Sequence, residues 1–343
     1  MAKHYVFLIH GMGEHKKGEW HLPWVKQLTE LSARYAGFAK TPLDKWVEFV
    51  PISYDALIEA RLTKWGKDAA KLEGKLGALG SGAESVFAWL KTASDEEKEF
   101  FWSHVADVVL WTLFAQERAS IEANVLLQVA KSLETMYGES GAHASTIIAH
   151  SLGTAVAHNV VHQLATSGAT KQGFGPNEHR WHNLFTIANV SRVIQTMPKV
   201  YESVTRPGPD GDANSACRHF YNVRHELDPF TWPKPFDPVG WPSFTKIAIR
   251  QVNDWNVHGI DHYFDNPRVH IPLLRAITSW RLITVDEEIA AVSQFDDETS
   301  LKSFDLTELS SLLPINPEGF NEPLQYVRLF VDTLARLQAL AAE

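Results

Sequence analysis

Six short runs of β-branched and aromatic residues recur along the chain, and helical patterns separate most of them. Apolar residues fill successive positions of each run instead of alternating ones, which is typical of parallel strands buried on both faces. The runs lie at residues 4–10, 46–54, 145–151, 184–190, 219–224 and 246–252. Strands that alternate with helices predict an α/β fold, in which helices flank a mainly parallel sheet and the crossovers are right-handed.

Two of the intervening segments have the pattern of amphipathic helices. Residues 23–37 open with a proline near the first turn, carry apolar residues at helical spacing and are predicted to stop at Gly37. Residues 117–138 follow the same pattern and end at a glycine as well.

The 343 residues are expected to form one domain, residues 1–343, with two additions. Residues 55–116 are helical in pattern, rich in tryptophan and too long for one crossover, so we interpret them as an inserted helical cap. Residues 281–343 are interpreted as a C-terminal helical extension that ends in an amphipathic helix at 324–343. That last helix is expected either to pack on the core or to form a homodimer contact. The aromatic stripe at 99–114 is expected either to pack on the sheet or to line an apolar acyl pocket.

Composition and charge limit the partners and the compartment. The formal net charge of −9 argues against a broad nucleic-acid surface. The single cysteine, Cys217, excludes an intramolecular disulfide and a thiolate metal cluster and fits a reducing compartment. The longest apolar candidate for a membrane span, residues 105–115, is too short and contains Asp107. We therefore expect a soluble cytoplasmic protein with no transmembrane segment and no nucleic-acid partner.

The junction between the third predicted strand and the next helix reads A-H-S-L-G, residues 149–153. A sharp strand-to-helix turn pushes its central side chain, here Ser151, out above the sheet and points the next backbone N–H groups toward the same place. Small residues such as Ala149 and Gly153 suit a point where strand and helix backbones approach closely. The pentapeptide alone is equally compatible with Ser151 as the N-cap of an ordinary helix.

This pentapeptide resembles the nucleophile elbow G-x-S-x-G of the α/β-hydrolase superfamily, and specifically of its lipase- and esterase-like serine members, with Ala149 in place of the first glycine. The first strand ends in H-G-M-G, residues 10–13, which resembles the oxyanion turn of the same superfamily. By this resemblance, the backbone N–H groups of Met12 and Leu152 are expected to bind the oxyanion. The resemblance covers residues 1–280 in architecture, whereas only four short motifs are specific.

A nucleophilic serine needs an acid that orients its base, and this acid is expected at the end of a later strand. Asp228 lies nearest to the end of the fifth predicted strand and is favoured for this role. Asp212 and Asp237, each in a loop rich in proline or glycine, and Glu226 are the alternatives.

The base is expected in the loop after the last strand, within residues 253–270. His258 comes first after the strand and is followed by a glycine, so it is favoured over His262. His270 falls inside a final helix that is expected to begin near Pro267, and we interpret it as a structural residue.

Ser151, Asp228 and His258 follow separate predicted strands in the order that the resemblance implies for an α/β-hydrolase. We therefore expect an enzyme, a serine hydrolase that cleaves a small-molecule carboxylic ester through an acyl-enzyme. If the aromatic stripe at 99–114 lines an acyl pocket, the ester is expected to be lipid-like. A thioesterase or an amidase would use the same residues, and a scaffold or binding protein with a vestigial site is the alternative from another class. The remaining histidines, including His150 and His158, are interpreted as core or surface residues. Since no phosphate loop, dinucleotide fingerprint or metal-ligand spacing is found, neither a cofactor nor a metal is expected.

Overall fold

The structure of the chain is a computed structural model, and several segments of the sequence lie outside the residues that it describes. The described residues are 3–11, 18–54, 115–139, 143–166, 179–195, 198–209, 212, 214–231, 234–252 and 257–299. The predicted cap therefore lies outside the described residues except for its last two positions, and so do the aromatic stripe at 99–114 and the terminal helix at 324–343. Among the described residues, no helix combines the length and the apolar character that crossing a bilayer requires.

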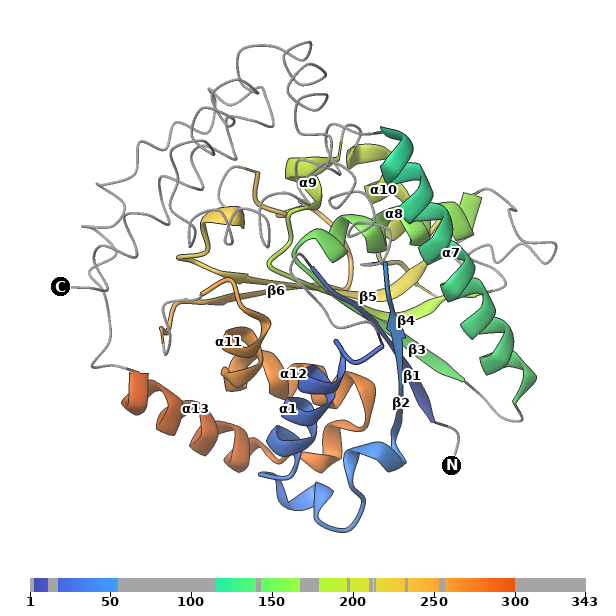
Figure 1. The fold of residues 1–343 in the computed structure, drawn as a ribbon. Helices are drawn as coiled ribbons and strands as arrows, with labels where there is room; N and C mark the ends of the chain where they lie inside the picture. Colours follow the sequence, from blue (N-terminus) through green and yellow to red (C-terminus); the bar gives the residue numbers. More distant parts are fainter. Residues whose placement is uncertain are drawn as a thin grey trace, which may run out of the picture.

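A six-stranded sheet forms the centre of the molecule, and its strands are all parallel (Figure 1). The strands are β1 (His4–Ile9), β2 (Val47–Ile52), β3 (Ala144–His150), β4 (Trp181–Ile187), β5 (Cys217–His225) and β6 (Phe244–Ile249). All six predicted strands are present, and their ends differ from the predicted ends by three residues at most. The predicted α/β fold with a parallel sheet between helices is confirmed.

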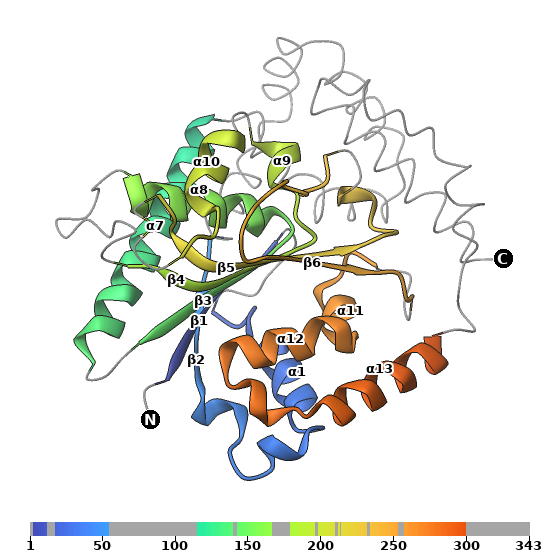
Figure 2. The same ribbon diagram turned by 180° about the vertical axis from the view of Figure 1, so that it is seen from behind.

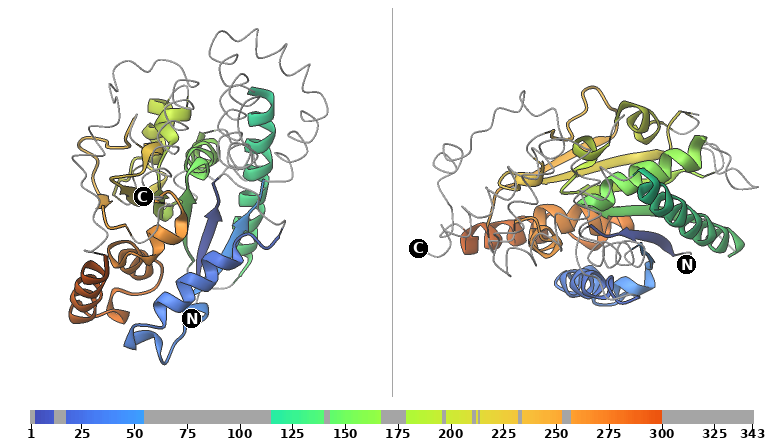
Figure 3. Two further views of the ribbon diagram at one scale, coloured as in Figure 1. Left: turned by 60° about the vertical axis from the view of Figure 1, so that its left-hand side comes forward. Right: turned by 45° about the horizontal axis from the view of Figure 1, so that its top comes forward.

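Helices cover both faces of this sheet (Figures 1 and 2). One face carries α7 (Ala115–Gly138), α8 (Leu152–Thr166), α9 (Ser191–Ile194) and α10 (Pro198–Thr205). The other face carries α1 (Leu22–Ser32), α11 (Ile260–Asp265), α12 (Pro267–Ile277) and α13 (Val285–Thr299). Short 3₁₀ turns join some of these elements, namely η1 (Ala36–Phe38), η2 (Leu43–Lys45), η4 (Pro229–Thr231) and η5 (Trp280–Leu282). In two further views, α7 (green) and α1 (blue) lie on opposite sides of the sheet (Figure 3).

The side chains of the central strands are buried on both faces, as their unbroken apolar sequences predict. In β1, Phe7 and Ile9 pack in the core beneath α7 and α8, whereas Val6 and Leu8 pack in the core beneath α1 and α12. All four side chains are fully buried. Each contributes about 1.5–3 kcal/mol relative to an exposed position. The two cores therefore hold the strands firmly, and with them the loops that leave their carboxyl ends.

The strand order β2-β1-β3-β4-β5-β6 reverses direction between β1 and β3. The chain passes from β1 to β2 on one side, whereas β4, β5 and β6 are added successively on the other side of β3. In open α/β sheets, ligands bind outside the carboxyl ends of the strands at such a reversal point. In this protein the reversal point brings the turn after β1 next to the junction between β3 and α8.

Helix α1 is shorter than the sequence predicts. It ends at Ser32, and the backbone becomes extended at Tyr35 before η1 begins. Gly37 does not stop a helix: a Cβ atom at this position would lie 2.2 Å from the carbonyl oxygen of Leu282, so the glycine permits close contact with η5. The helix predicted over residues 117–138 is confirmed as α7, and α12 begins at Pro267 as expected.

Candidate active site

Ser151 is the one residue between the end of β3 and the start of α8. Its φ of +53° lies in the left-handed region, which residues with a side chain rarely enter. The turn is held by its own backbone, because Ser151 N donates to Ile187 O at 3.0 Å and Thr154 Oγ1 donates to Ser151 O at 2.6 Å. Among the described residues the Ser151 hydroxyl bonds only to His258, so the N-cap interpretation does not account for it.

Two glycines allow the end of β1 to approach this junction. A Cβ atom on Gly153 would lie 2.3 Å from the carbonyl oxygen of His10, and one on Gly11 would lie 2.6 Å from Ser151 Cβ. Neither position has room for a side chain. The turn that begins with His10 and Gly11 therefore lies directly against Ser151, while Met12, the predicted oxyanion residue of this turn, falls outside the described residues. Leu152, the other predicted oxyanion residue, is the first residue of α8, where backbone N–H groups lack intrahelical acceptors.

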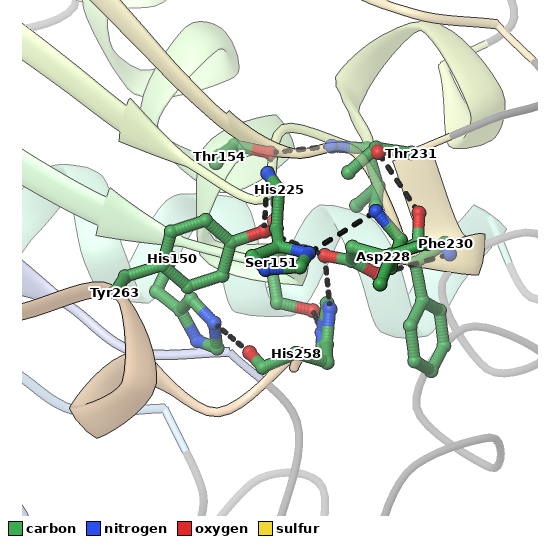
Figure 4. A network of polar contacts seen from close by, with 11 residues as sticks. His150, Ser151, Thr154, His225, Asp228, Phe230, Thr231, His258 and Tyr263 are labelled. Carbon is green, nitrogen blue, oxygen red and sulfur yellow. Dashed lines mark hydrogen bonds and ion pairs between the residues drawn. The ribbon is translucent and has the colours of Figure 1, made fainter. Parts of the chain in front are cut away.

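Ser151, His258 and Asp228 form a continuous chain of hydrogen bonds (Figure 4). Ser151 Oγ lies 2.8 Å from His258 Nε2, and His258 Nδ1 lies 2.9 Å from Asp228 Oδ2. An ionised carboxylate only accepts hydrogen bonds, so Nδ1 carries the proton and Nε2 of the neutral ring accepts from the serine hydroxyl. The exposed fractions of the three residues are 1%, 9% and 0%. The arrangement can transfer a proton from Ser151 to His258 and is shielded from bulk water.

Asp228 lies three residues after the end of β5 and is bound by several donors. Its Oδ1 accepts the backbone N–H of Phe230 at 3.1 Å, and its Oδ2 accepts the hydroxyl of Tyr263 at 2.8 Å. Burial by itself raises the pKa of Asp228, but the neighbouring His258 and these hydrogen bonds outweigh burial and hold the pKa below its usual value. The carboxylate is therefore ionised at neutral pH.

Tyr263, on α11, is a residue of this network that the sequence interpretation missed. Its side chain is fully buried, and its oxygen accepts the backbone N–H of His225 at 3.1 Å while its hydrogen goes to Asp228. Burial raises the pKa of Tyr263 well above 10, so the phenol stays protonated and donates. The sequence signal was limited to an aromatic residue five positions after His258.

The alternative bases bind other partners. His262 Nε2 lies 3.1 Å from the carbonyl oxygen of Gln251, and the His262 ring packs against His225 at 5.0 Å between centroids. His270 lies in α12, as expected, where Tyr35 Oη is 2.6 Å from its Nε2. The structure brings His258, and neither of these two, to Ser151.

The alternative acids are also engaged elsewhere. Asp237 pairs with Lys246, and Glu226 lies 3.7 Å from the guanidinium of Arg250. Asp212 Oδ1 accepts the backbone N–H of Asn214 within its own loop. The catalytic roles of the three residues that do meet stay predictions until activity is measured.

In the part of the chain that the structure describes, no group of three or more His, Cys, Asp or Glu side chains could hold a metal ion. A scan with models of known protein families finds no match to this chain, and a search of curated proteins finds none either. The geometry around Ser151 is therefore the observation from which a function is inferred.

Proposed function

We propose that the protein is a serine hydrolase of the α/β-hydrolase type that cleaves carboxylic esters through an acyl-enzyme. The observation that carries the proposal is the chain of hydrogen bonds from Ser151 Oγ through His258 to Asp228, formed at a junction where the serine has a φ of +53°. A hydroxyl is a weak nucleophile, and a neighbouring base oriented by a carboxylate is the arrangement that activates it.

In the proposed reaction, Ser151 Oγ attacks the acyl carbon and His258 Nε2 takes the hydroxyl proton. Asp228 holds Nδ1–H and stabilises the positive charge that forms on the imidazole ring. The backbone N–H of Leu152 and, by the resemblance, that of Met12 bind the oxyanion. His258 then protonates the departing alkoxide. Water attacks the acyl carbon bound to Ser151 and gives its proton to His258. His258 returns this proton to Ser151 Oγ as the bond between Oγ and the acyl carbon breaks and the acid is released.

The position of the three residues in the sheet supports the same proposal. The proposed nucleophile follows β3, the acid follows β5 and the base follows β6, so each lies beyond the carboxyl end of its strand. The nucleophile stands at the reversal point of the strand order, where α/β sheets bind their ligands. Serine, acid and base also occur along the chain in the order of α/β-hydrolases.

Hydrolysis of a panel of p-nitrophenyl esters, acyl-CoA thioesters and aryl amides tests the proposal, with the Ser151→Ala variant as the background. We expect the highest kcat/KM for an ester, a burst of nitrophenol equal to the enzyme concentration, and no activity in the variant. A preference for thioesters would keep the nucleophile and change the substrate class. A wild-type protein that hydrolyses nothing above the variant would contradict the proposal and favour a binding protein with a vestigial site.

A further inference from the structure

His150, the residue before the proposed nucleophile, contacts the loop of the proposed base. It is the last residue of β3, and 8% of its surface is exposed. Its Nε2 lies 2.8 Å from the backbone carbonyl oxygen of His258 (Figure 4). A carbonyl oxygen only accepts hydrogen bonds, so Nε2 of His150 carries a hydrogen and is the donor of this hydrogen bond. The side chain at the end of β3 therefore binds the backbone of a residue 108 positions later.

The same ring touches the other parts of the site. A Cβ atom on Gly11 would lie 3.1 Å from Nδ1 of His150, so the turn after β1 passes directly beside the ring. The ring centroid lies 5.1 Å from that of His258 and 6.3 Å from that of Tyr263. Trp24 of α1 packs edge-on against His150 at 6.1 Å. His150 thus contacts the oxyanion turn, the base and the tyrosine that binds the acid.

The backbone of His258 needs such a contact because it belongs to neither a strand nor a helix. It lies in a turn, and α11 begins only at Ile260. Phe230 packs against the imidazole ring at 4.0 Å between centroids, and the ring nitrogens bond to Ser151 and Asp228. The hydrogen bond from His150 Nε2 reaches the backbone behind this ring. A displacement of about 1 Å in a reacting group costs about 10²-fold in rate.

We infer that His150 is a positioning residue, which holds the backbone of His258 against the nucleophile elbow and so keeps the base within reach of Ser151. It acts through His258 and transfers no proton itself, because its Nε2–H is directed to the carbonyl oxygen. The inference rests on the proposed function, since it assigns a role within the same reaction.

Three variants and one control test this inference. His150→Phe removes the donor and keeps an aromatic ring. His150→Gln places an amide N–H near the position of Nε2, whereas His150→Asn is too short to place one there. The control, His270→Asn, loses a comparable buried bond at Nε2, since this nitrogen lies 2.6 Å from the Tyr35 hydroxyl and asparagine is too short to reach its position. His270 contacts none of the three proposed catalytic residues.

The measurements are the second-order rate of Ser151 labelling by a fluorophosphonate, and kcat and KM for a p-nitrophenyl ester. We expect His150→Phe and His150→Asn to lower the labelling rate and kcat by about 10- to 100-fold with KM changed less than about twofold, because the base acts in the transition state. His150→Gln should recover most of the loss, and the control should match the wild type once folded fractions are equalised by circular dichroism.

Two outcomes would overturn the inference. In the first, His150→Phe, or His150→Asn where the Phe variant does not fold, labels as fast as the wild type. In the second, His150→Gln folds and is as slow as His150→Asn, which would assign the effect to the ring and not to the hydrogen bond. A wild-type protein that is not labelled at all would instead contradict the proposed function, so the two failures are distinguishable.

Discussion

The two ends of β3 each carry a buried serine beside a buried histidine, yet we propose a catalytic role for only one of the two pairs. At the amino end, Ser145 Oγ lies 3.3 Å from His179 Nε2, and His179 Nδ1 lies 2.7 Å from the hydroxyl of Tyr137. At the carboxyl end, Ser151 lies 2.8 Å from His258, whose other nitrogen bonds to a carboxylate. The two pairs differ in the third group, which is the group that bonds to the second nitrogen of the histidine. They differ as well in the backbone conformation of the serine.

The third group decides whether the histidine can accept a proton. Burial, reinforced by the neighbouring His182, lowers the pKa of His179 to about 3, because a hydroxyl partner does not compensate a buried charge. A charge that forms on His258 meets the Asp228 carboxylate at 2.9 Å. Ser145 also lies within the regular ladder of β3, opposite Tyr5 of β1, whereas Ser151 stands on a turn at a helix N-terminus. We therefore expect the pair of Ser145 and His179, which has neither a carboxylate partner nor a strained turn, to have no part in catalysis.

Replacing the histidines one at a time should give the largest contrast between the two ends. His258→Ala should lower kcat for a p-nitrophenyl ester by about 10⁴-fold or more, because it removes the base. His179→Ala should leave kcat of the folded protein within about twofold. His262→Ala serves as a second control, since a loss of activity in this variant with activity retained in His258→Ala would move the base to His262.

Replacing the third group is expected to have the next largest effect. Asp228→Asn keeps the size of the side chain but no longer stabilises the charged ring or fixes its Nδ1–H tautomer, so kcat should fall by about 10³- to 10⁴-fold. Tyr137→Phe makes the matching change at the amino end and should not alter kcat. Equal effects of the two variants, measured by initial rates on the same ester, would remove the distinction between the pairs.

Tyr263→Phe should have a smaller effect at the carboxyl end. Asp228 loses one donor to its charged form, and a hydrogen bond to a charged group is worth about 1.5–3 kcal/mol, so kcat/KM should fall by about 10- to 100-fold. The pKa of Asp228 should rise for the same reason. Tyr35→Phe, which removes a buried tyrosine hydroxyl bonded to His270, is the matched control and should keep full activity. An unchanged kcat/KM in Tyr263→Phe would show that the acid needs no help from the phenol.

The smallest effect concerns stability and arises at the amino end. His179, with a pKa of about 3, binds fewer protons when folded than in the unfolded chain, where a histidine has a pKa of about 6.5. The free energy of unfolding should therefore fall as the pH drops from about 6.5 toward 3, by up to about 1.4 kcal/mol per pH unit for this residue. The contribution of Asp228, whose pKa is lowered, is lost only as the pH falls below about 3.9.

Urea unfolding between about pH 7 and pH 5 measures this slope. His179→Gln should reduce the slope by a substantial part of the maximum of about 1.4 kcal/mol per pH unit. Asp228→Asn should leave the slope unchanged in this pH range. A slope that is the same in His179→Gln and the wild type would mean that His179 does not stay neutral in the folded protein.

The six strands were predictable because buried parallel strands consist of unbroken apolar runs, a signal that needs no knowledge of partners. The residues Ser151, Asp228 and His258 were predictable as candidates because each follows such a run. Their meeting could be expected, since the carboxyl ends of parallel strands share one edge.

Side-chain roles that depend on a distant partner were not predictable. His150 was interpreted as a core or surface residue because its partner, the carbonyl of His258, is remote in the sequence and is a backbone atom. Tyr263 was missed, since nothing local indicates that its hydroxyl reaches Asp228. Gly37 was misread for the same reason: the contact that requires a glycine there comes from Leu282, far along the chain.

The most direct test of the central claim is to treat the folded protein with a fluorophosphonate and map the modified residue by peptide mass spectrometry. Ser145 is the second residue of β3 and Ser151 directly follows the last one, so both serines are read in a single experiment. We predict stoichiometric modification of Ser151, none of Ser145, and no labelling after acid unfolding or in Ser151→Ala. Modification of Ser145, or of neither serine in a folded sample, would contradict the account.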